Sequence, residues 1–143
     1  MLYLDTSLLV PLFVPEPDST AVRGWFNVRA DESLAISEWT LTEFASAMSI
    51  KVRDKKLKPD QARDACALLE KLAADSLKVF TPARRDYGKA VEYLGQHALG
   101  LRAGDALHLA VAQNEGADCL YTLDRRLIEA GRKLRLKVAS PLY

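Results

Sequence analysis

Four acidic residues stand at points of the sequence where a carboxylate could do chemistry. Asp5 ends the apolar run MLYL and is followed by two hydroxyl residues, in MLYLDTSLLV. Asp105 opens the helical stretch GDALHLA, Asp124 ends the run CLYTLD, and Glu43 lies in SEWTLTEF near the start of another helical stretch. An apolar strand gains nothing from ending in an unpaired carboxylate, so local structure explains Asp5 least well.

The other three acids also have local explanations. Asp105 and Asp124 lie at helix starts, where a carboxylate caps backbone N–H groups and meets the positive end of the helix dipole. Glu43 lies at the edge of an apolar helix face and can be a solvated acid. As a set, however, several ionised carboxylates at one place repel one another unless protons or cations neutralise them.

Oxygen-only ligands of this kind select a hard divalent cation. Mg²⁺ binds through one or two carboxylates and retained waters, and Mn²⁺ suits the same ligands. A cation held in this way lowers the pKa of a bound water and offsets charge on a phosphoryl oxygen. The acidic set therefore predicts metal-assisted phosphodiester hydrolysis, with Mg²⁺ as the cofactor and Mn²⁺ as a substitute.

Alternating strand-like and helix-like stretches must bring these acids together. We expect short strands at 2–4, 33–36, 77–80, 119–124 and 136–140. Longer helices are expected at 15–30, 38–54, 58–76, 83–98 and 104–116, the second and third forming an antiparallel hairpin. This alternation predicts an α/β fold, a three-layer α/β/α sandwich with a short, mainly parallel central sheet. The functional crevice of such a sheet lies beyond the carboxyl ends of its strands.

Length and composition are those of an ordinary globular protein. The 143 residues are 49% hydrophobic and 27% charged, which suits a single domain over 1–143 with a real core. No apolar stretch approaches the ~20 residues that cross a bilayer. The N-terminal apolar run has no basic region before it and is interrupted by Asp5, so we expect no signal peptide and a cytoplasmic protein.

The two cysteines indicate neither a metal site nor a disulfide. Cys66 falls in a helical pattern and Cys119 opens a strand pattern, with no CxxC motif. No metal-ligand spacing links either one to His97 or His108. We expect two buried, reduced thiols.

Positive charge is concentrated in two stretches although the net charge is only +1. RRLIEAGRKLRLK at 125–137 carries six bases and one acid, and KVRDKKLK at 51–58 is also basic. These stretches are either solvated helix ends or a rim that binds phosphates. Arg125, Arg126 and Arg102, which lies three residues before an acid, are candidates for contact with substrate phosphate.

The ordered set MLYLDTSLLV, the Glu43 helix, GDALHLA and YTLD resembles the four acidic motifs of PIN-domain ribonucleases. Length, motif order and spacing are most similar to the VapC toxins of toxin–antitoxin pairs, and the resemblance covers nearly the whole chain. It implies a metal-dependent endoribonuclease that cuts RNA. Asp5, Glu43, Asp105 and Asp124 match the acids that bind Mg²⁺ or Mn²⁺ in that family.

The resemblance also implies supporting residues and partners. Ser7 and Thr122 match positions where a hydroxyl supports the acids. Glu43 is preferred to Glu38 by its match to the helix motif, and Glu38 is the alternative. The implied partners are an RNA substrate, a cognate antitoxin that blocks the site, and a second copy in a homodimer or a toxin–antitoxin hetero-oligomer, with no membrane. The RNA itself is not identified, because no base-reading motif is present.

Four further residues have two explanations each. His108 lies one helical turn after the acid of GDALHLA and either touches the site or, as we favour, is a core or supporting residue. Trp25, Phe26 and Trp39 are either core residues or part of a homodimer interface, to which the helical hairpin would contribute.

Other functions fit parts of the pattern. A haloacid-dehalogenase-like phosphatase needs a second Asp two residues after the first, where this sequence has Ser7. A receiver domain needs paired acids at the first strand and a late Lys, where the sequence has Asp5 alone and Arg125. A PIN-like RNA-binding module, or an RNA-processing nuclease without a toxin role, is the alternative to the toxin, although the presence of all four acids argues against lost activity.

Overall fold

A five-stranded, all-parallel sheet with strand order β3-β2-β1-β4-β5 forms the centre of the protein. The structure is a computed structural model and describes residues 1–143. The strands are β1 (Leu2–Leu4), β2 (Leu34–Ser37), β3 (Lys78–Phe80), β4 (Cys119–Tyr121) and β5 (Val138–Ala139). The helices are α1 (Thr6–Phe13), α2 (Ser19–Asn27), α3 (Glu38–Arg53), α4 (Pro59–Ser76), α5 (Arg84–Leu94), α6 (Ala103–Asn114) and α7 (Arg125–Lys133), with a 3₁₀ turn η1 (His97–Leu99).

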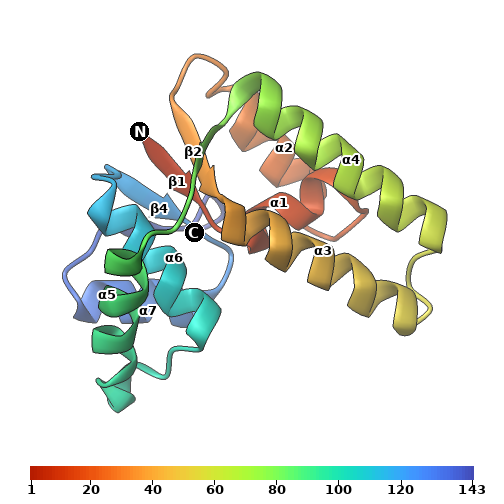
Figure 1. Cartoon of the computed structure of the whole chain (residues 1–143). Coiled ribbons are helices and arrows are strands. Elements are labelled where there is room, and N and C mark those ends of the chain that lie inside the picture. The colour runs from red at the N-terminus through yellow and green to blue at the C-terminus, as the bar shows by residue number, and fades with distance from the viewer.

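Helices cover both faces of the sheet, which confirms the predicted α/β/α sandwich (Figure 1). Successive residues of β1 serve opposite faces, because side chains alternate along a strand. Tyr3 packs into the core under α5, α6 and α7, whereas Leu4 packs into the core under α1 to α4. Coverage on both faces explains why the strands read as short continuous apolar runs.

Several element boundaries differ from the expected ones. The strand expected at 119–124 ends at Tyr121. Beyond Thr122, whose N–H still donates to the Ala139 carbonyl, the N–H groups of Leu123 and Asp124 donate to side-chain hydroxyls and not to a neighbouring strand. The helix expected at 83–98 ends at Leu94, before η1 and Gly100 with its left-handed φ of 64°. The helix expected from residue 15 begins at Ser19, after a stretch with two prolines. The strands at 33–36 and 136–140 shift to the bounds given above.

The position of β1 at the middle of the sheet determines where the acids gather. β1 pairs with β2 on one side and with β4 on the other, so the carboxyl ends of the three strands lie side by side. Leu4 pairs with Tyr121, and the Asp5 N–H donates to the Tyr121 carbonyl at 3.0 Å. The chain therefore leaves β1 at Asp5 directly beside the loop that follows β4.

Helices α3 and α4 form the expected antiparallel hairpin, which extends away from the sheet (Figure 1). Phe44, Met48 and Leu69 are buried where the two helices meet the rest of the core. Trp25 belongs to the same core with 8% of its surface exposed, and its ring centroid lies 4.7 Å from that of Tyr121. Of its two explanations, Trp25 is thus a core residue, while the homodimer itself stays a prediction.

The cysteines are free, as expected, but half-buried rather than buried. Cys66 lies in α4 and Cys119 in β4. No helix combines the length and the apolar character that a membrane span requires.

Packing of α7 against β5 generates a test of the fold. A Cβ atom added at Gly131 would lie 2.2 Å from Val138 Cγ2, whereas a Cβ at Gly88 in α5 would meet nothing within 4 Å. Overpacking of this kind typically costs about 1–3 kcal/mol, so Gly131→Ala should lower the free energy of unfolding by that order. Gly88→Ala is the control and should raise it by up to about 1 kcal/mol, the helix cost of glycine. Urea denaturation measures both, and equal effects would contradict this packing.

Candidate active site

Asp5 is a fixed and well-partnered carboxylate. It is the N-cap of α1, directly before the helix begins at Thr6. Its side chain is buried, and Oδ2 accepts hydrogen bonds from the Ser7 hydroxyl at 2.6 Å, the Thr122 hydroxyl at 2.7 Å and the Ser7 N–H at 3.3 Å. Three donors on one oxygen hold the carboxylate in a single orientation.

The two hydroxyls also tie α1 to the loop after β4. The Ser7 hydroxyl accepts from the Leu123 N–H at 2.9 Å, and the Thr122 hydroxyl accepts from the Asp124 N–H at 3.0 Å. The structure therefore places Ser7 and Thr122 on Asp5, where the sequence comparison with the family motif put supporting residues. The same links keep the backbone of Asp124 close to Asp5.

Glu43, and not Glu38, lies beside Asp5. Glu38 is the exposed first residue of α3, while Glu43 is half-buried one and a half turns later. Glu43 Oε2 accepts from the Thr6 hydroxyl and is 2.8 Å from His108 Nε2. No hydrogen bond reaches Oε1, so this oxygen is left available to a ligand.

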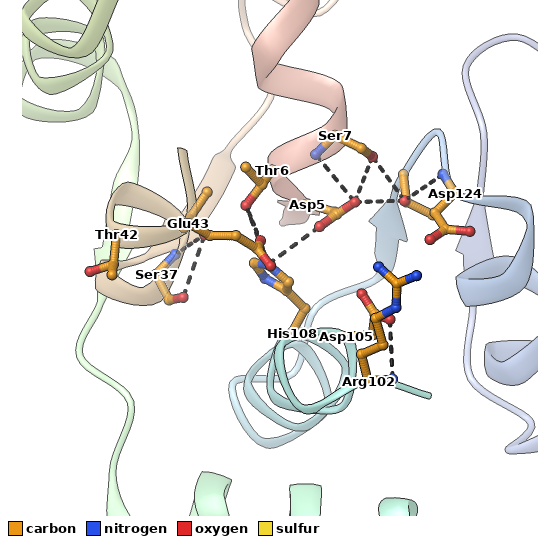
Figure 2. Close-up of polar contacts among 12 residues, drawn as sticks. Asp5, Thr6, Ser7, Ser37, Thr42, Glu43, Arg102, Asp105, His108 and Asp124 are labelled. Atoms are coloured by element: carbon orange, nitrogen blue, oxygen red, sulfur yellow. Dashed lines mark hydrogen bonds and ion pairs between the residues drawn. The ribbon is translucent and has the colours of Figure 1, made fainter. Parts of the chain in front are cut away.

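His108 is fully buried, in agreement with the core or supporting role favoured from the sequence, and it also contacts two of the acids. Its Nε2 lies 2.8 Å from Glu43 Oε2 and 3.3 Å from Asp5 Oδ1. Its Nδ1 lies 3.1 Å from the Tyr3 hydroxyl, which donates to the Ser37 hydroxyl at 2.9 Å. Figure 2 shows the imidazole lying against Asp5 and Glu43. Tyr3 and Ser37 were missed, and only their hydroxyls within apolar strands could have indicated them.

The acids do not share one electrostatic environment. Burial lowers the pKa of His108, but Tyr3 and the Glu43 and Asp5 carboxylates outweigh it and raise that pKa to about 10. Burial raises the pKa of Glu43, but the His108 and Thr6 hydrogen bonds bring it below its usual value. Glu43 is thus an ionised carboxylate stabilised by a buried imidazolium.

The pKa of Asp105 is shifted in the opposite direction from that of Glu43. Burial raises its pKa, the Arg102 N–H lowers it, and the negative charges of Asp5, Asp124 and Glu43 raise it further. The net pKa lies above the usual value. The repulsion between carboxylates that the sequence predicts is therefore present, and it contributes to the raised pKa of Asp105.

Asp105 and Asp124 border the site from two helix starts. Asp105 lies in the first turn of α6, where its carboxylate accepts from the Arg102 N–H at 3.3 Å. Asp124 is the N-cap of α7 and accepts from the Arg126 N–H at 2.8 Å. Figure 2 shows both at the side of the site opposite Glu43. Both local roles proposed from the sequence are present, together with the proximity of the four acids.

The compact group of possible metal ligands differs from the predicted set of four acids. Asp5, Glu43 and His108 each offer one ligand atom, and these atoms lie within 4.8 Å of one another. Asp105 and Asp124 lie outside this group. Carboxylate oxygens, which all four acids offer, are the ligands that suit Mg²⁺ or Mn²⁺. The His108 Nε2 already faces the carboxylates of Glu43 and Asp5, so it is not free to bind a metal ion as well.

The basic stretches lie at different distances from these acids. Arg126 is exposed beside Asp124, with its Nε 3.8 Å from Oδ1, and the Arg125 guanidinium lies over the Tyr143 ring at 4.8 Å from the ring centroid. The stretch 51–58 instead forms the end of the α3–α4 hairpin, and Figure 1 shows this end away from the sheet. Only the first stretch can form a rim at the site.

Gly104 permits the close approach of α3 to α6. A Cβ atom at residue 104 would lie 2.7 Å from Glu43 Oε1 and 3.2 Å from Trp39 Nε1. The half-buried Trp39 thus lines the space behind Glu43, and its indole N–H is buried without a hydrogen-bond partner. The glycine of GDALHLA has a steric reason that the sequence alone does not reveal.

Comparisons with known proteins agree with this geometry. Residues 2–133 match the family model of the PIN domain. The chain is 31% identical over 145 residues to Ribonuclease VapC35 of Mycobacterium tuberculosis, covering 99% of this chain and 97% of that protein. It is 32% identical over 142 residues to Ribonuclease VapC46 of the same species, covering 98% and 97%.

Solved structures show the same fold. Mycobacterium tuberculosis VapC20, a toxin that cleaves the sarcin–ricin loop, superposes with a TM-score of 0.73 at 18% identity, covering 92% of this chain and 95% of that one. VapBC2 from Rickettsia felis, solved with a DNA fragment from its promoter, superposes with a TM-score of 0.71 at 24% identity, covering 98% of both chains.

The Gly104 contact generates a prediction about the site. Gly104→Ala should lower the melting temperature only slightly, because the added Cβ meets the flexible end of Glu43 and, at 3.2 Å, the edge of the Trp39 ring. It should displace that carboxylate, so a several-fold higher Mg²⁺ or Mn²⁺ concentration should be needed to raise the melting temperature. Gly88→Ala makes the same change at an open helix position and should respond to cations as the wild type does. An identical cation titration for Gly104→Ala would show that Glu43 does not contact the ion.

Proposed function

Because the chain belongs to the PIN-domain family, we propose that it is a metal-dependent endoribonuclease that hydrolyses RNA phosphodiester bonds, as the toxin of a toxin–antitoxin pair. The observation that carries the proposal is the convergence of Asp5, Glu43, Asp105 and Asp124 at the carboxyl edge of the sheet, where burial and the charges of the other three acids together raise the pKa of Asp105. The ribonuclease names of relatives that match along the whole chain support it.

The four acids fit a divalent cation, and we propose Mg²⁺, with Mn²⁺ as a substitute. Two observations support this choice of cofactor: Glu43 Oε1 receives no hydrogen bond, and negative charge from three neighbouring acids acts on Asp105. Asp5, Glu43 and Asp105 would hold the ion, with Asp124 binding directly or through water. When bound, the cation activates a water for attack and offsets charge on the phosphoryl oxygen.

The remaining residues orient the acids and bind the substrate. The Ser7 and Thr122 hydroxyls fix the Asp5 carboxylate, so it faces the site without reorganisation. The exposed Arg126, with Arg125 and Arg102 as further candidates, attracts the RNA phosphates to a site whose own charge is negative. Opposite charges at the rim and at the centre allow an anionic polymer to approach an acidic site.

We also propose a protein partner and a cellular location. Structural neighbours include VapBC complexes, and some of these are bound to DNA. An acidic crevice beside exposed helices suits an antitoxin segment of positive charge. We propose that the toxin acts in the cytoplasm, in a homodimer or in a hetero-oligomer with its antitoxin.

Asp5→Asn tests the proposed activity. It keeps the shape of the N-cap but removes one charge, so cleavage should fall by a few orders of magnitude, because charge stabilisation by a metal contributes several kcal/mol. The assay follows a fluorogenic RNA with and without Mg²⁺, and thermal melting reports folding. Asp64→Asn makes the same change on the exposed surface of α4 and should cut at the wild-type rate. If Asp5→Asn cleaves normally and Mg²⁺ stabilises it as it does the wild type, Asp5 is a structural residue.

Arg126→Ala tests the basic rim. Asp124 caps α7 by accepting a hydrogen bond from the backbone N–H of Arg126, so the substitution leaves that bond in place. The substitution is made in the Asp5→Asn variant, so that the RNA is bound but not cut. Binding of single-stranded RNA should weaken, and the magnitude of the slope of log K against log salt should decrease by about 0.7, the value for one phosphate contact. Cation-induced stabilisation should not change. Arg63→Ala on the exposed surface of α4 is the control, and an equal effect there would indicate a loss of general charge only.

A further inference from the structure

A buried chain of hydrogen bonds lies behind the acids and is not explained by cation or RNA contacts. It runs from the Ser37 hydroxyl through the Tyr3 hydroxyl to His108, and from His108 to Glu43 and Asp5. We propose that His108 and Tyr3 are positioning residues for cation binding: the imidazole sets the arrangement of the two carboxylates, and the tyrosine hydroxyl fixes the imidazole. This inference rests on the proposed metal-dependent nuclease.

The surroundings of His108 determine which way its ring faces. Nε2 lies between carboxylate oxygens of Glu43 and Asp5, at 2.8 Å and 3.3 Å, so this nitrogen donates to both. The side chain is 0% exposed, and its ring packs edge-on against Tyr3 with centroids 5.8 Å apart. Because both ring nitrogens have partners and the ring is enclosed, the imidazole has one orientation.

The shared Nε2–H donor faces one oxygen of each carboxylate, Oε2 of Glu43 and Oδ1 of Asp5. Glu43 uses Oε2 for His108 and Thr6, and its Oε1 has no donor. Asp5 uses Oδ2 for the hydroxyls and turns Oδ1 toward His108. Without this donor, repulsion between two carboxylates whose oxygens lie within 4.8 Å of each other would move them apart. The imidazole therefore holds them together before any cation arrives, and the cation does not have to order them.

Tyr3 connects this arrangement to the sheet. Its hydroxyl joins His108 of α6 to Ser37, the N-cap of α3, and the Ser37 N–H donates to the Thr40 hydroxyl at 3.2 Å. The strand that delivers Asp5 thus also sets the positions of the helices that carry Glu43 and His108. Tyr3 touches neither acid, so any effect of its hydroxyl on cation binding must act through His108.

The experiment compares Tyr3→Phe, His108→Gln and His108→Leu with the wild type. The cation concentration at the midpoint of stabilisation is measured by thermal melting with Mg²⁺ and with Mn²⁺, without RNA. In parallel, the cation concentration for half-maximal cleavage and the rate at saturating cation are measured. Val111→Ala is the control, because Val111 is equally buried on α6 and makes no polar contact with the site.

We expect the cation midpoint to rise by about tenfold in Tyr3→Phe and by up to about 100-fold in His108→Leu, the usual range for residues that orient metal ligands. His108→Gln keeps an N–H donor near Nε2 and should lie between the wild type and His108→Leu. Saturating cation should restore most of the cleavage rate in Tyr3→Phe, because excess ion orders the carboxylates itself. Val111→Ala should melt earlier with an unchanged midpoint.

Two results would overturn the proposal. If Tyr3→Phe and His108→Leu behave like Val111→Ala, the hydrogen-bond chain contributes only to folding. If His108→Gln abolishes cation binding while Tyr3→Phe binds like the wild type, His108 is itself a ligand. Absence of RNA cleavage by the wild type would contradict the proposed function separately, since the melting midpoints do not depend on RNA.

Discussion

Repulsion between carboxylates at the carboxyl edge of the sheet is the constraint on which the arrangement of this protein depends. Parallel pairing of β2, β1 and β4 brings the segments after these strands to one edge, and α6 adds its first turn. Acids in these segments are neighbours because of the strand pairing itself. The folded protein must offset their mutual repulsion or use it to bind a cation.

The structure offsets the repulsion at two of the acids and leaves it in place at a third. Asp5 is held by hydroxyls of Ser7 and Thr122, and Glu43 by the imidazole of His108, so these two carboxylates are ordered and compensated. Asp105 has only one backbone donor, and its pKa is raised by burial and by the charges of the neighbouring acids. The site is thus rigid on the side of α1 and α3 and electrostatically unsatisfied on the side of α6, which is the condition that favours uptake of a positive ion.

The rest of the fold supports this division. The core under α5 to α7 places α6 against β1, and the core under α1 to α4 places α3 there from the other face. Gly104 removes the Cβ that would keep α3 and α6 apart at Glu43. Positive charge lies at the edge of the acidic cluster, where the exposed Arg126 stands beside Asp124 at the start of α7.

The fold class could be predicted from the sequence alone, and so could the four acids that the structure brings together. Strand and helix patterns are local, and apolar runs of two to four residues between amphipathic helices indicate a parallel sheet whatever the tertiary details. Asp5 was informative because it interrupts such a run. Element ends were less certain: the expected strand stops at Tyr121, because the N–H groups of Leu123 and Asp124 donate to side-chain hydroxyls and not to a neighbouring strand.

The contacts that hold the acids in place could not be predicted from the sequence. The contacts of His108 with Tyr3, Asp5 and Glu43 join residues 65 to 105 positions apart, and no local periodicity encodes such pairs. The choice of Glu43 over Glu38 and the placing of Trp25 in the core likewise depend on which helix face meets the sheet. Residue types set the chemistry that is available, but the packing of α3 and α6 against β1 sets the distances at which that chemistry can operate.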